Sequence, residues 1–206
     1  MKCEEKELKK KLVFEIKRKI VHIFLGVLII YFLSAGVIDD FTLFVVLVCS
    51  IFVSICSKYI HVPIWDQILQ RFDRPESRRN FPGRGFIYFI AGALLSIKLF
   101  PQDIAFASIM IVTIGDSASC IFGMSYKLIT RKNGNKKELF GTFSALLLSL
   151  GFAMIFVGFK EALIASAIAL FAEFAEFRLN KQKIDDNLVV PLVAGTTILL
   201  IRKFFL

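Results

Sequence analysis

The stretch MIVTIGDSASCIFG, residues 110–123, decides the fold. It is an apolar run that contains one carboxylate, Asp116, and it continues in both directions to cover residues 104–125. A run of this length is typical of a helix that crosses a bilayer, which takes about 20 residues. Hydrophobic residues make up 56% of the 206-residue chain, whereas an average soluble domain has roughly 45–50%. The sequence therefore excludes an ordinary soluble enzyme.

Six further apolar runs surround this one, so we predict an all-α polytopic membrane protein with about seven transmembrane helices. The runs are too long, and alternate too little, for the strands of a membrane barrel. Residues 1–19 are predicted to form a cytoplasmic or interfacial basic helix, and residues 20–206 a single transmembrane domain. The predicted spans are 20–38, 41–60, 86–100, 104–125, 139–158, 161–177 and 188–201.

The basic residues predict the orientation of these spans. Of the 26 Lys and Arg residues, 22 fall in the N-terminal segment and on the side of the three long connections. The positive-inside rule places that side in the cytoplasm. Because the basic residues occupy separate gaps and do not form one continuous surface, the net charge of +9 does not indicate a nucleic-acid partner.

Two predicted spans carry carboxylates that a passive bundle does not need. Asp116 follows Gly115 in the fourth span, and an intramembrane carboxylate usually faces a cavity or a polar partner. The structural alternative is a hydrogen bond to Ser or Thr on a neighbouring helix. Glu173 and Glu176 lie three residues apart near the cytoplasmic end of the sixth span and can share one face.

The first span begins with a polar stripe. Glu15, Arg18 or Lys19, and His22 recur at helical spacing and so lie on one face. Such a stripe can gather phosphate oxygens. A positive-inside anchor explains Arg18 and Lys19 equally well, but it explains His22 less well.

Two connections add anion-binding and metal-binding candidates. In the turn Pro82-Gly83-Arg84-Gly85, the glycines let backbone N–H groups approach an anion, and arginine can bind phosphate with two hydrogen bonds. Contact with anionic lipid headgroups is the alternative. The stretch Asp185-Asp186-Asn187 can hold a divalent cation or cap the helix that follows.

Taken in order, these stretches resemble the family of membrane-embedded CTP-dependent lipid kinases, which includes dolichol and polyprenol kinases, phytol kinases and CTP-dependent diacylglycerol kinases. The resemblance covers nearly the whole chain. It rests on five motifs in the family's order: EIKRKIVH (15–22), PGRG (82–85), the G-D helix with Gly115, Asp116, Ser119 and Gly123, the K-x-x-x-G-T element with Lys137, Gly141 and Thr142, and D-N-L-x-x-P with Asp186, Asn187 and Pro191.

The resemblance implies transfer of the γ-phosphoryl group of CTP to a lipid hydroxyl group. It implies that Asp116, with Asp186 and Asn187, holds a divalent cation, either Mg²⁺ or Ca²⁺, and that His22 or Glu176 takes the hydroxyl proton. The acid of the sixth span is expected to be Glu176 in preference to Glu173. The residues implied to bind CTP are Arg18, Lys19, Gly83, Arg84, Gly85, Gly115, Lys137, Gly141, Thr142 and Asn187.

Two other functions remain open from the sequence. A phosphatidate cytidylyltransferase also uses CTP and a membrane lipid, but Lys137-Glu138 stands where that enzyme typically has a K-D pair. A small ion-coupled transporter would use Asp116 and the glutamates as an ion path, but the unusual residues gather on one face. The expected setting is a multi-pass protein of a prokaryotic plasma membrane with its site on the cytoplasmic face; a homo-oligomer is compatible with the sequence.

Overall fold

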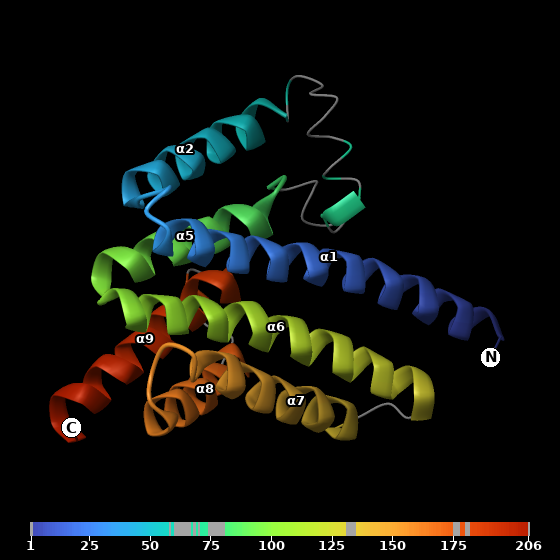
Figure 1. Cartoon of the computed structure of the whole chain (residues 1–206). Coiled ribbons are helices and arrows are strands. Elements are labelled where there is room, and N and C mark those ends of the chain that lie inside the picture. The colour runs from blue at the N-terminus through green and yellow to red at the C-terminus, as the bar shows by residue number, and fades with distance from the viewer. Residues whose placement is uncertain are drawn as a thin grey trace.

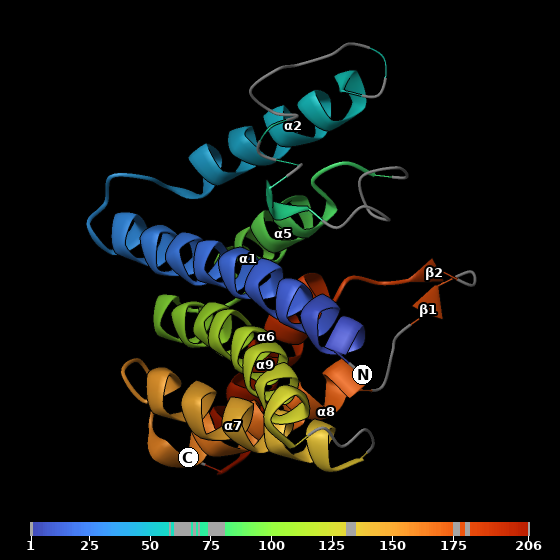
Figure 2. The ribbon, with the colours of Figure 1, turned by 90° about the vertical axis from the view of Figure 1, so that its right-hand side faces the viewer.

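The computed structural model describes residues 2–57, 59, 67, 69, 71–73, 81–130, 135–174, 178–179 and 182–205. Within these residues the chain forms seven helices (Figure 1) and one short antiparallel strand pair (Figure 2). The elements are α1 (Lys2–Ser34), α2 (Asp40–Cys56), α5 (Arg84–Leu99), α6 (Gln102–Thr130), α7 (Asn135–Ala153), α8 (Phe159–Phe174), β1 (Arg178–Leu179), β2 (Gln182–Lys183) and α9 (Asp186–Phe205).

Each of the seven predicted apolar runs coincides with one of these helices, so the prediction of a helical protein is confirmed. By length and composition, α6 and α9 can cross a membrane, and α2 and the stretch Glu138–Ala153 of α7 are shorter apolar helices. The structure is thus consistent with a helical membrane protein, with a membrane crossing indicated for two helices and not for seven.

The predicted N-terminal helix and the predicted first span form one continuous helix, α1. At a rise of 1.5 Å per residue its 33 residues extend about 50 Å, whereas a hydrocarbon core is about 30 Å thick. Helix α1 is therefore longer than a hydrocarbon core is thick, and its charged first turns would extend beyond such a core.

Helix α6 lies at the centre of the bundle and packs against α1, α5, α7, α8 and α9 (Figures 1 and 2). Its residues from Ile104 to Gly115 are buried without interruption. By contrast, many large apolar side chains of α1, α2 and α7 point outward, among them Phe24, Phe52 and Phe143. Apolar side chains on the outside are what a bilayer requires, and in water they would form an interaction patch.

Glycines set the closest helix contacts. A Cβ atom on Gly26 of α1 would meet the side chain of Thr113, and one on Gly141 of α7 would lie 2.7 Å from the backbone oxygen of Ser119. A Cβ atom on Gly92 of α5 would meet the backbone oxygen of Asn187 at the start of α9. Small residues allow membrane helices to approach closely, so these glycines fix how α1, α7 and α9 lie around the centre.

Ion pairs join helix ends where the chain makes its short connections. Lys98 at the end of α5 pairs with Asp40 at the start of α2. Arg202 near the end of α9 pairs with Glu161 at 2.7 Å and with Asp103 at 2.6 Å. The sequence predicts that Lys98 and Arg202 lie on the side opposite to the basic connections, and in the structure each is paired with a carboxylate.

Candidate active site

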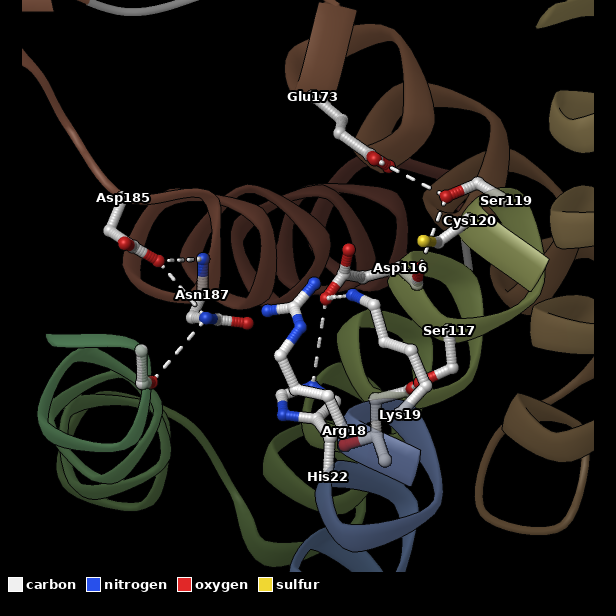
Figure 3. A network of polar contacts seen from close by, with 12 residues as sticks. Arg18, Lys19, His22, Asp116, Ser117, Ser119, Cys120, Glu173, Asp185 and Asn187 are labelled. Carbon is white, nitrogen blue, oxygen red and sulfur yellow. Dashed lines mark hydrogen bonds and ion pairs between the residues drawn. The ribbon is translucent and has the colours of Figure 1, made fainter. Parts of the chain in front are cut away.

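The polar stripe of α1 faces α6. Lys19 is only 2% exposed and forms an ion pair with Oδ2 of Asp116. The His22 Nε2 atom lies 3.9 Å from the same carboxylate oxygen. Arg18 is held by Glu15 at 2.6 Å. The structure thus brings the polar stripe of α1 and the carboxylate of Asp116 together (Figure 3).

Asp116 and Gly115 are neighbours in sequence but face different helices. The Asp116 side chain is 28% exposed and points toward α1. A Cβ atom on Gly115 would instead contact Leu170 of α8 and Ser149 of α7 at 3.8 and 3.9 Å. Gly115 therefore lies at a helix-packing contact, where it allows the neighbouring helices to come close.

The turn before α5 adopts the conformation that only glycine takes easily. Gly83 has φ of 74° and is the N-cap residue of α5. Its N–H donates to Oδ2 of Asp73 at 2.9 Å, and the carbonyl of Pro82 accepts from Ser54 Oγ at 2.6 Å. These two contacts hold the turn at the helix N-terminus, where the helix dipole favours an anion.

The start of α9 lies against this turn. Asn187 donates from Nδ2 to Oδ1 of Asp185 at 3.0 Å and to the carbonyl of Gly85 at 3.5 Å. Arg84 lies 3.2 Å from Asp185. Burial raises the pKa of the Asp185 carboxyl, while the hydrogen bond from the Asn187 backbone and the charge of Arg84 act in the opposite direction. Asp186 is the first residue of α9.

A cavity of about 300 Å³ lies where α1, α5 and α6 meet. Its polar residues come from three helices and one connection, and Figure 3 shows Arg18 pointing toward the space between Asp116 and Asn187. Its other side is apolar. The residues that line it are Arg18, Val21, His22, Leu25, Leu69, Phe72, Asp73, Gly83, Gly85, Phe86, Phe89, Asp116 and Asn187.

Two polar atoms at this cavity have no hydrogen-bond partner among the described residues: His22 Nε2 and Asn187 Oδ1. A buried polar atom without a partner is costly, which makes it a candidate for contact with a ligand. Nε2 can accept a proton, and an amide oxygen is a ligand that Mg²⁺ and Ca²⁺ accept.

The residues at this cavity would suit a divalent cation that is bound by protein oxygens and by phosphate oxygens at the same time. No group of three or more His, Cys, Asp or Glu side chains that could hold a metal occurs in the described part of the chain. However, Mg²⁺ is commonly held by one or two carboxylates together with substrate phosphates. Asp116 and the unpartnered Asn187 Oδ1 line the same cavity and provide such a partial set.

Several residues proposed from the sequence do not line the cavity. Lys19 contacts Asp116, and Arg84 contacts Asp185. Gly141 packs against α6, and Thr142 donates its hydroxyl hydrogen to the carbonyl of Glu138 within α7. Glu176 and the side chain of Lys137 lie outside the described residues.

Glu173 is the glutamate of α8 that the structure describes. Its Oε1 lies 3.5 Å from the hydroxyl of Ser119, which is one turn beyond Asp116 on α6. The sequence favours Glu176 over Glu173, although the spacing to Asp186 does not match the family cleanly. The contact with Ser119 places Glu173 near Asp116 and Lys19 (Figure 3).

Sequence reasoning missed Asp73 and the apolar wall. Asp73 lies in a basic connection where nothing marked it as a partner of the glycine turn ten residues later. Phe89 lies in an apolar run in which the sequence does not distinguish it from its neighbours, but its ring contacts the imidazole of His22 at 4.4 Å between centroids. The available signal was helical spacing, because Val21 and Leu25 lie four residues apart on the part of α1 that carries His22, which indicates an apolar surface beside the imidazole.

The chain is 31% identical over 188 residues to an uncharacterized protein of Methanocaldococcus jannaschii, a match that covers 88% of this chain and 91% of that protein. It is 24% identical over 159 residues to CTP-dependent diacylglycerol kinase 1 of Schizosaccharomyces pombe, covering 68% of this chain and 71% of that one. The kinase of the same name from Saccharomyces cerevisiae is 22% identical over 148 residues, which cover 70% of this chain and 51% of the yeast protein. No protein-family model and no solved structure matches the chain.

Proposed function

We propose that this chain, which belongs to the same family as the uncharacterized Methanocaldococcus jannaschii protein, is a membrane lipid kinase that transfers the γ-phosphoryl group of CTP to a lipid alcohol. Its distant relatives include two CTP-dependent diacylglycerol kinases, which supports a phosphotransferase. The observation that carries the proposal is the cavity where Arg18, His22, Asp116 and Asn187 meet beside an apolar wall.

The phosphate side of the site consists of Arg18 and the turn before α5. Arg18 lines the cavity, and a guanidinium group can bind phosphate with two parallel hydrogen bonds. Gly83 and Gly85 line it as well, at the N-terminus of α5. Lys137 and Thr142 are further proposed contacts of CTP, and Arg84 would act beside them at the edge of the turn.

A divalent cation is part of the proposal, with Asp116 and Asn187 as its protein ligands and Asp186 as a third candidate. When bound, such an ion neutralises phosphate charge and orients the triphosphate. Lys19 is buried and forms an ion pair with the Asp116 carboxylate, so in this proposal it stabilises the negative charge of Asp116 from the side away from solvent.

His22 is the proposed general base. Its Nε2 atom is buried at the cavity without a hydrogen-bond partner among the described residues, so it can accept the hydroxyl proton of the acceptor. The acceptor oxygen then forms a bond to the γ-phosphorus as the bond to the β–γ bridging oxygen breaks. The products are the phosphorylated lipid and CDP, and the proton resides on His22 until solvent removes it.

The test is label transfer by purified protein in detergent or liposomes. We expect label from γ-labelled CTP, and none from α-labelled CTP, to appear in a panel that contains diacylglycerol, polyprenols, phytol and phosphatidate. Asp116→Asn should abolish transfer. Asp103→Asn, which changes a half-buried acid paired with Arg202 at the other end of the same helix, should retain it. Label from the α position alone would identify a cytidylyltransferase and refute the kinase.

The chain is proposed to be a multi-pass membrane protein whose site lies on the cytoplasmic side. The site lies toward the start of α5 and of α9, which are the helix ends that adjoin the basic connections. CTP is a cytoplasmic metabolite with a charge that the bilayer excludes, so the donor has to arrive on that side. Cysteine labelling of Lys17→Cys in intact and opened vesicles would test the orientation.

A further inference from the structure

The cavity has an apolar wall that phosphate chemistry does not need. Val21 and Leu25 of α1 and Phe86 and Phe89 of α5 line it directly beside the polar residues. The cavity is at the lower end of the range of about 300–1,000 Å³ for small-molecule sites. It is therefore too small for a nucleoside triphosphate and a lipid together, and most of each molecule has to lie outside it.

We propose that this wall is the acceptor subsite: it takes the carbon atoms next to the hydroxyl group of a lipid alcohol, which reaches the cavity sideways from the bilayer between α1 and α5. The inference rests on the proposed function and adds where the second substrate binds. The cavity itself is then the point where the terminal phosphate and the hydroxyl group meet.

The face of α1 supplies the direction. Arg18, His22 and Leu25 follow one another along the cavity, so its lining changes from cation to imidazole to aliphatic side chain within about 10 Å of helix. Phe24 lies next to Leu25 in sequence, but its side chain is 62% exposed on the outer surface. A lipid chain that enters between α1 and α5 and reaches Leu25 would deliver its hydroxyl group to His22 and Asp116.

Phe89 acts as a positioning residue in this arrangement. It is 2% exposed, and its ring packs at 4.4 Å and 54° against the imidazole of His22. The contact limits rotation of the imidazole, and the same ring forms part of the apolar wall. One side chain thus fixes both the proposed base and the carbon chain of the acceptor.

The first test needs no turnover. Two probes, a dioctanoylglycerol and a prenol that each carry a diazirine near the hydroxyl end, are photolysed with the wild-type protein in liposomes. We expect peptides that contain residues 21–25 and 86–89 to be labelled, and excess unmodified alcohol, but not its O-methyl ether, to suppress this label. Labelling spread over outward-facing helices, or unaffected by competition for both probes, would overturn the subsite.

The second test uses neighbouring positions on one helix. Leu25→Trp should fill the apolar side and raise KM for the lipid acceptor about tenfold or more, with little change of KM for CTP. Phe24→Trp, on the outer surface, should change neither constant. Leu25→Ala, which removes volume without blocking, should keep the protein folded and shift preference toward acceptors that are bulkier beside the hydroxyl group; equal effects at positions 24 and 25 would contradict the proposal.

The two tests separate this inference from the proposed function. Competed labelling without transfer from γ-labelled CTP would leave the acceptor subsite in place and refute the kinase. Transfer without competed labelling of α1 and α5, and with unchanged acceptor KM in Leu25→Trp, would support the kinase and refute the subsite.

Discussion

The ammonium group of Lys19 and the carboxylate of Asp116 form an ion pair between α1 and α6 at the polar end of the cavity. Lys19 is 2% exposed, so its charge is removed from solvent, and its direct ion-pair partner among the described residues is Asp116. Arg18, one residue earlier, lines the cavity instead. Two adjacent cations that are equivalent in the sequence therefore lie in different surroundings.

Replacing one partner of this pair should cost stability as well as activity. Lys19→Met leaves the Asp116 carboxylate without its buried cation, and breaking a buried ion pair on one side costs about 3–5 kcal/mol. The double variant Lys19→Met with Asp116→Leu should regain most of the lost melting temperature in detergent yet stay inactive. Additive losses of stability in the double variant would show that the pair does not hold α1 to α6.

Arg18 should affect the nucleotide more than the fold. Arg18→Lys keeps the charge but loses the planar fork, so KM for CTP should rise about tenfold while the melting temperature changes little. Lys17→Gln removes an exposed charge one residue away and serves as the control. An equal rise of KM in both variants would mean that general positive charge, and not the Arg18 geometry, attracts CTP.

Asn187 should link activity to the divalent cation. Its Oδ1 is buried without a hydrogen-bond partner in the described part of the chain, so Asn187→Leu removes a ligand and Asn187→Asp keeps an oxygen there. Chelation by EDTA should abolish transfer in the wild type. The Leu variant should need about tenfold more Mg²⁺ than the wild type for half-maximal activity. CTP-dependent Mn²⁺ binding measured by electron paramagnetic resonance should weaken in parallel; an unchanged metal dependence would remove Asn187 from the ligand set.

Asp73 should hold the glycine turn before α5. Asp73→Ala removes the acceptor of the Gly83 N–H, and an unsatisfied donor costs about 1–3 kcal/mol when it is buried. Asp73→Asn keeps an oxygen that can accept this bond and should restore most of the melting temperature and of the KM for CTP. If Asn is as damaging as Ala, the charge of Asp73 matters and the turn is not its main role.

Gly92 should set the position of Asn187. A methyl group at residue 92 would meet the backbone oxygen of Asn187, so Gly92→Ala should push the start of α9 away from α5 and cost about 1–3 kcal/mol. Gly151→Ala is the matched control, because a Cβ atom there meets nothing within 4 Å. Activity should fall in Gly92→Ala and remain in Gly151→Ala; loss in both would indicate a general effect of glycine replacement on these helices.

The candidate site was only partly predictable from the sequence. Helical spacing placed Glu15, Arg18 and His22 on one face, and the structure has them there. It could not say which face of α6 would meet them, and so Gly115 and Asp116 were grouped although they point at different helices. The proposed roles of these residues in CTP binding and catalysis remain predictions.

Gly141 shows why a motif is not yet a site. In the sequence it stood beside Thr142 as a candidate for CTP binding. In the structure it lies where α7 touches the backbone of Ser119 and Gly123, so its lack of a side chain already has a packing reason. The position of a glycine in the sequence does not distinguish close approach of a ligand from close approach of a helix.

The sequence by itself determined that the protein is helical and where its seven described helices lie, because the length and hydropathy of a run depend only on neighbouring residues. Only the tertiary structure decided that Lys19 pairs with Asp116 and that Asp73 accepts a hydrogen bond from Gly83. It also decided that an apolar wall borders the polar residues of the cavity. The Lys19–Asp116 pair and the apolar wall join residues far apart in the chain, and they depend on how closely the helices pack, as at Gly26 and Gly92. Helical periodicity fixes which residues share a face, but only packing selects the helix that this face meets.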